Sequence, residues 1–163
     1  MRFVILSLVF GLLLSSAPPA EQSAASVEVV GAMKQPLRLN AEDLSKMPRA
    51  SVDTRFDGVA VHYEGVWLTE VLKKAGVPSG VELRGKWLTG YLLMEAEDGY
   101  QVIFTLADLD PMFGGNPVLL ADAANGKALS GAEGPFRLVA PRDRRGARSV
   151  RMLKKIEIVL LRK

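Results

Sequence analysis

The chain has 163 residues and carries 21 Lys and Arg against 18 Asp and Glu, a net charge of only +3. It contains no cysteine, which excludes disulfides, thiolate metal sites and a nucleophilic thiol. The excess of positive charge is small, and the N-terminal segment predicts an exported protein. We therefore expect no nucleic-acid partner. The position of the charge is therefore more informative than its sum.

Residues 1–25 are typical of a secretory signal peptide. A charged start precedes a mainly apolar run over residues 3–14, and mostly small residues follow as far as Ala25. The apolar run is short for a helix that spans a bilayer. We therefore predict a periplasmic or secreted protein, with cleavage between residues 17 and 26. An uncleaved segment that anchors the protein in a membrane is the alternative.

The remainder, residues 26–163, has the size of one domain. Short apolar segments bounded by Gly, Pro, Asn or Asp predict its strands. These segments are 27–31 with its continuation 37–39, 50–56, 59–63, 91–96, 100–104, 117–121, 136–140 and 156–161. Asp57-Gly58 and Asp98-Gly99 each join two strands and are strong hairpin signals.

Few segments predict helices. Asn40 is expected to cap a helix over 41–44, with Asp43 at the capping-box position. Apolar residues at helical spacing predict a second helix over 66–75, and one helical turn is expected over 105–109. Short strands with few helices predict an α+β fold with mainly antiparallel sheet.

The densest positive charge lies in residues 142–151, which we call the basic loop. Its basic residues are Arg142, Arg144, Arg145, Arg148 and Arg151. Asp143 is the single acid within it. So many guanidinium groups around one loop are unfavourable unless an anion, distant carboxylates or water compensates them. The sequence therefore predicts a site for a small anionic ligand here, and a solvated basic face is the competing interpretation.

Common catalytic signatures are absent from the sequence, including glycine-rich phosphate loops, HExxH and GxSxG. His62 is the only histidine, so a multi-histidine metal site cannot be built. Within a strand, it is more simply interpreted as a hydrogen-bonded strand residue.

Four aromatic residues lie in or beside apolar runs. They are Trp67, Trp87, Tyr91 and Tyr100. Their positions favour core packing over a platform for stacking a ligand.

Five short motifs stand in an order that resembles one known family. They are 63–68 (YEGVWL), 97–100 (EDGY), 119–121 with 125–129 (LLA, NGKAL), 134–141 (GPFRLVAP) and 146–151 (GARSVR). Together they resemble the molybdopterin-binding domain of the sulfite-oxidase family, and most closely its small exported members. The resemblance implies the α+β fold of that family, with a pterin held by the basic loop.

The resemblance and the charge together select the candidate site residues. The candidate cofactor-binding residues are Arg142, Arg144, Arg148, Ser149, Arg151 and His62. The sequence offers no candidate catalytic residue and no metal ligand.

Two departures from the family change the functional expectation. Members with redox activity hold molybdenum through a cysteine, which this chain lacks. Enzymes with this cofactor are usually exported folded by the twin-arginine route, yet Arg2 is the only arginine before the apolar run.

We therefore predict a binding or accessory protein with no metal cofactor, for which molybdopterin is the ligand implied by the resemblance. A molybdopterin-dependent oxidoreductase is the first alternative, and it ranks below the accessory protein because a shared fold does not by itself carry activity. A basic loop that docks on anionic lipid or polysaccharide is the second alternative.

Overall fold

The structure is a computed structural model that describes residues 25–56 and 58–161. The predicted signal peptide lies outside the described residues except for Ala25, as does Asp57 of the first predicted hairpin. No helix in the described part of the chain is long and apolar enough to cross a membrane.

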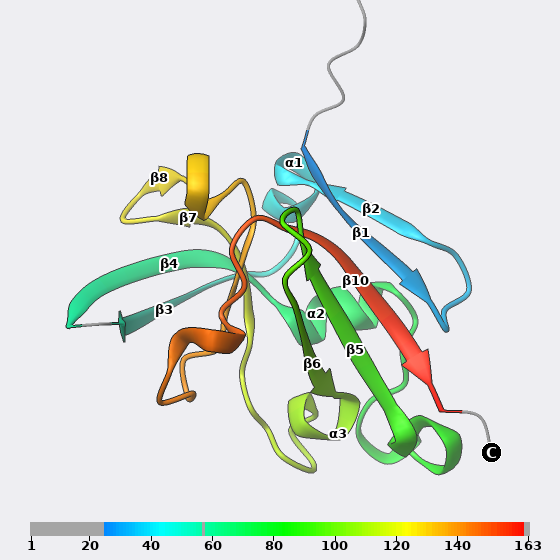
Figure 1. Ribbon diagram of the computed structural model, residues 1–163. Coiled ribbons are helices and arrows are strands. Elements are labelled where there is room, and N and C mark those ends of the chain that lie inside the picture. The colour runs from blue at the N-terminus through cyan, green and yellow to red at the C-terminus, as the bar shows by residue number, and fades with distance from the viewer. Residues whose placement is uncertain (1–24, 57, 162–163) are drawn as a thin grey trace, which may run out of the picture.

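One sheet has five strands in the order β2-β1-β10-β5-β6 (Figure 1). Strand β1 pairs in parallel with β10, and the other neighbours pair antiparallel. The first and last strands therefore lie side by side inside this sheet. Its strands are β1 (Ser26–Gly31), β2 (Leu37–Asn40), β5 (Gly90–Ala96), β6 (Gln101–Thr105) and β10 (Leu153–Leu160).

The second sheet is built on the predicted hairpin around Gly58. It runs in the order β3-β4-β7-β8, and β9 also pairs with β7. At Gly65 the strands β4 and β7 approach so closely that a Cβ would stand 2.1 Å from the carbonyl oxygen of Leu120. Its strands are β3 (Arg49–Phe56), β4 (Val59–Trp67), β7 (Leu119–Ala124), β8 (Lys127–Ala128) and β9 (Arg137–Val139).

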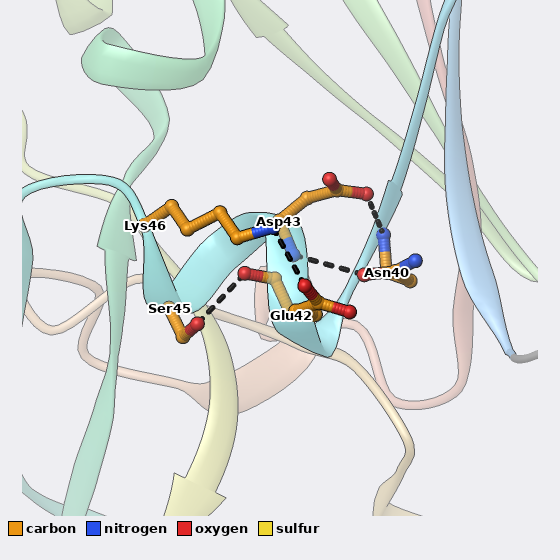
Figure 2. A network of polar contacts seen from close by, with 5 residues as sticks. All are labelled: Asn40, Glu42, Asp43, Ser45 and Lys46. Atoms are coloured by element: carbon orange, nitrogen blue, oxygen red, sulfur yellow. Dashed lines mark hydrogen bonds and ion pairs between the residues drawn. The ribbon is translucent and has the colours of Figure 1, made fainter.

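The helix α1 (Ala41–Ser45) has the capping box that the sequence predicts (Figure 2). The backbone N–H of Asp43 donates to Asn40 Oδ1 at 2.9 Å, and the backbone N–H of Asn40 donates to Asp43 Oδ2 at 3.0 Å. These two bonds satisfy donors that a helix N-terminus otherwise leaves open. Lys46 adds an exposed ion pair with Glu42 at 2.6 Å.

The other helices are also short. The predicted helix over 66–75 is α2 (Leu68–Lys74), which begins two residues later than predicted because Val66 and Trp67 pair with β7. Helix α3 (Leu106–Leu109) is the predicted single turn. The described residues also form four 3-10 turns: η1 (Gly80–Glu82), η2 (Gly85–Thr89), η3 (Gly131–Glu133) and η4 (Gly146–Arg148).

Both faces of the second sheet carry apolar residues, but they meet different surroundings. One face, with Val66, Leu120 and Leu138, belongs to the main core with the five-stranded sheet and the helices. The opposite face forms a smaller cluster around buried Tyr63 and Val139. The α+β class with mixed and antiparallel sheets is confirmed, and the smaller cluster positions the candidate site.

The prediction of core packing for the four aromatic residues is wrong at Tyr100. Trp67 and Trp87 are partly buried against apolar clusters, and Tyr91 is half-buried. Tyr100 is 48% exposed because it lies in the turn between β5 and β6, ahead of the first residue of β6. Its hydroxyl instead donates to the carbonyl of Ala147 at 2.8 Å, which ties the turn to the basic loop.

Candidate anion-binding cavity

A cavity of about 960 Å³ lies between the β3–β4 hairpin and the basic loop. In Figure 1 the orange segment that contains η4 lies beneath this hairpin, and the cavity is lined by Tyr63 of the smaller apolar cluster. The cavity therefore uses the face of the second sheet that the main core does not cover.

Strand alternation supplies the apolar wall of this cavity. Val59, Val61 and Tyr63 are alternate residues of β4, and all three line the cavity. Side chains point to opposite faces at successive strand positions, so His62 between them faces the other way. Tyr63 is 4% exposed and packs in the smaller apolar cluster, so this end of the wall is held in place.

The polar lining is strongly positive. Its arginines are Arg55, Arg137, Arg144, Arg145 and Arg151. Among the described residues that line the cavity, Glu133 is the one acid. Guanidinium groups bind carboxylate and phosphate oxygens through paired N–H donors, so this lining is suited to an oxyanion.

Arg137 is the most deeply placed of these arginines. It belongs to β9, its side chain is 11% exposed, and its guanidinium carbon lies 5.2 Å from the centre of the Tyr63 ring. Burial is the main cause that lowers the pKa of Arg137, and the charge of Arg151 acts in the same direction. Negative charge beside it would offset both effects, and Glu133 already forms an ion pair with it.

Ser149 links the cavity to the sheet behind it. It is 5% exposed, and its hydroxyl oxygen accepts a hydrogen bond from the backbone N–H of Ala140 at 3.1 Å. A hydroxyl that accepts one bond keeps its own proton to donate to another acceptor. Ser149 can therefore hold the loop in place and donate to a ligand.

Two of the predicted site arginines point away from the cavity. Arg142 donates to the carbonyl of Gly115 at 2.9 Å. Arg148 makes two hydrogen bonds to Asp143, at 2.8 and 2.7 Å, and its guanidinium carbon lies 4.5 Å from the centre of the Phe104 ring. The hydrogen bonding of Arg148 to the Asp143 carboxylate is the main cause that raises the pKa of Arg148. Both arginines therefore stabilise the basic loop through contacts outside the cavity.

His62 is also separate from the cavity. The His62 ring is exposed, and its Nδ1 atom lies 2.8 Å from Asp53 Oδ1. The backbone N–H of His62 donates to Asn125 Oδ1 at 3.1 Å. Of the six candidate residues, the structure brings Arg144, Ser149 and Arg151 together at the cavity. It does not bring Arg142, Arg148 or His62 there.

Several residues that line the cavity are not among the candidates predicted from the sequence. Arg137 was visible as an arginine inside the apolar run 136–140, where burial of a charge requires a partner. Arg55 and Glu133 carried no such signal, because their place depends on how the hairpin and η3 pack against the loop.

The fold and the cavity together define an α+β domain with an arginine-lined binding site. The chain belongs to the family of the oxidoreductase molybdopterin binding domain, whose model matches residues 15–161. The resemblance to the sulfite-oxidase-type domain is thereby confirmed. The match begins inside the predicted signal peptide, so the domain boundary at residue 26 stays a prediction.

A solved structure shares the fold. The sulfane dehydrogenase SoxCD from Paracoccus pantotrophus matches with a TM-score of 0.63 and 24% sequence identity. The match covers 82% of this chain and 38% of that chain, so this chain spans well under half of the other's length. No curated protein matches this chain significantly.

The donor set can be tested against the cofactor that the family name implies. Guanidinium groups with the Ser149 hydroxyl fit the phosphate of a pterin. A molybdenum ion held by a protein thiolate does not fit, because the chain has no cysteine. The described residues also contain no group of three or more His, Cys, Asp or Glu that could hold a metal ion.

Proposed function

We propose that the protein is an exported binding or accessory protein whose cavity holds a phosphorylated, pterin-like ligand without a protein-bound molybdenum centre. The observation that carries this proposal is the cavity itself, which combines five arginines with an apolar wall. The predicted signal peptide supports the export.

Each part of the cavity has a task in this proposal. Arg144 and Arg151 of the basic loop bind the phosphate oxygens, and the Ser149 hydroxyl donates a further hydrogen bond. The β4 wall with Val61 and Tyr63 supplies the apolar surface that a flat heteroaromatic ring requires. Charge-assisted hydrogen bonds each contribute roughly 1.5 to 3 kcal/mol net, so a few of them suffice for specific binding.

The absence of cysteine from the sequence supports the accessory role over catalysis. A thiolate is the soft ligand that such a metal centre uses, and neither Asp57 nor His62 is a ligand of the same kind. In this proposal the chain's own residues bind and orient the ligand.

The second candidate function is a molybdopterin-dependent oxidoreductase. Membership of an oxidoreductase family favours it, since the family model covers almost the whole described chain. It requires that the ligand retain molybdenum without a bond to a protein thiolate.

Analysis of protein purified from its native compartment separates these candidates. We measure molybdenum by elemental analysis and pterin by fluorescence after oxidation of the denatured protein. Bound pterin without stoichiometric molybdenum is the expected result, whereas stoichiometric molybdenum would establish the oxidoreductase. Absence of pterin together with salt-sensitive binding to anionic vesicles would favour the basic loop as an envelope-docking surface.

A further inference from the structure

Glu133 lies where an anionic ligand is expected to bind. Its Oε2 pairs with Nη1 of Arg137, and its Oε1 lies 3.5 Å from Nη1 of Arg151. One carboxylate thus bridges two guanidinium groups, one on β9 and one at the end of the basic loop. A bridging oxyanion from a ligand requires the same geometry.

We infer that Glu133 is a built-in counter-anion, which a ligand must displace from Arg137 and Arg151, so that only an anion that also gains contacts with the remaining arginines, such as dianionic phosphate, binds well. This inference rests on the proposed function, because it concerns the same cavity. It adds the residue that sets the charge the ligand must carry.

Burial shows which partner can move. The side chain of Arg137 is 11% exposed, whereas that of Glu133 is 44% exposed and that of Arg151 is 57% exposed. Arg137 is also held over the Tyr63 ring. A ligand that takes this position therefore leaves Arg137 in place and releases Glu133 into solvent.

The backbone around Glu133 favours this release. Glu133 ends the short turn η3, and the hydrogen bonds from the N–H groups of Glu133 and Gly134 to Ser130 and Gly131 are long, at 3.3 and 3.4 Å. Hydrogen bonds of this length are weak. A small change in this turn can withdraw the carboxylate without disturbing β9.

The preference for phosphate follows from the charge of the ligand and from the tethering of the Glu133 carboxylate to the chain. A carboxylate on a short tether has an effective concentration of about millimolar or more. A free monocarboxylate has the same charge as Glu133 and displaces it with no electrostatic gain. A phosphate monoester brings up to two charges and three acceptor oxygens, so it gains interactions with the remaining arginines.

The test is calorimetric titration of the full chain with inorganic phosphate and with acetate, at about pH 8, where phosphate is mainly a dianion. Ionic strength is held constant, because surface pairs are screened by salt. The variants are Glu133→Gln and, as a matched control, Glu82→Gln, which removes the same charge from an exposed pair with Arg84 outside the cavity.

Glu133→Gln should bind phosphate about threefold to tenfold more tightly, as expected for removal of two partly exposed ion pairs. Acetate affinity should rise by a similar factor, because both anions displace the same carboxylate, and Glu82→Gln should match the wild type. Glu133→Asp, whose shorter side chain cannot bridge both arginines, should have an intermediate affinity. It also replaces Glu133→Gln if that variant does not fold.

Unchanged or weaker phosphate binding by Glu133→Gln would overturn the inference, because Glu133 would then only position Arg137. If that result came while the wild type still bound phosphate through Arg144 and Arg151, the proposed function would stand. If neither the wild type nor Glu133→Gln bound phosphate, both proposals would fail together.

Discussion

The two sides of the basic loop use the same residue type for different purposes. On the outer side, Arg142 and Arg148 bond to Gly115 and Asp143. On the inner side, Arg144 and Arg151 line the cavity. A run of arginines in a sequence is therefore not one site, because each guanidinium group acts through the partners that the fold gives it.

The largest expected effect is a loss of phosphate affinity on changing the arginines of the inner side, which line the cavity. The double variant Arg144→Ala/Arg151→Ala should lower phosphate affinity by at least about a hundredfold, because it removes two charge-assisted contacts of roughly 1.5 to 3 kcal/mol each. Its melting temperature should stay close to that of the wild type. Titration calorimetry and thermal melting measure the two quantities. A large fall in melting temperature would show that the inner arginines are structural.

On the outer side of the loop, a substitution should lower the stability of the protein more than its phosphate affinity. Arg148→Ala removes a two-bond pair with Asp143 and the contact with the Phe104 ring, and should cost about 1 to 2 kcal/mol of unfolding free energy. Urea unfolding measures this loss. Asp143→Asn removes the ion pair but keeps the ring contact, so it should lose less stability. Equal losses would show that the ring contact contributes nothing.

A smaller effect concerns the lysines that continue the basic segment into β10. Hydrogen bonds from Lys154, then from Lys155 and Gln101, lower the pKa of Glu95 from 4.5 to about 2. Because this pKa is lower in the folded protein, the unfolded chain binds more protons, and stability should fall as the pH drops from 4.5 towards 2. Glu95→Gln should flatten this part of a stability-against-pH curve. An unchanged slope would contradict the assignment.

The smallest effect should come from His62. His62→Ala should leave phosphate affinity unchanged, because the ring faces away from the cavity and pairs with exposed Asp53. The change in unfolding free energy should be under about 1 kcal/mol, as for other exposed pairs. Calorimetry that showed a marked loss of phosphate binding would place His62 in the site after all.

Local signals in the sequence were sufficient for most of the fold. The Asn40 and Asp43 capping box, the hairpins and the α+β class depend on short-range chemistry that one segment contains. The start of α2 was misplaced because Val66 pairs with a strand that lies more than fifty residues away, and tertiary pairing outweighs helical spacing.

The site was predictable only in outline for the same reason. The charge of the basic loop identified the region, and three of the six candidate residues line the cavity. Which way each arginine points depends on distant partners such as Gly115 and Phe104, and no local pattern reveals these. Glu133 was overlooked because its importance comes from bridging Arg137 and Arg151 in space.

The parallel pairing of β1 with β10 has a consequence for how the chain reaches its native state. Strand β10 lies between β1 and β5, so the five-stranded sheet stays split into two unpaired pieces until the C-terminal strand arrives. Exposed strand edges and distant pairing delay stable folding. A chain truncated before residue 153 should thus stay unfolded and protease-sensitive, which limited proteolysis measures.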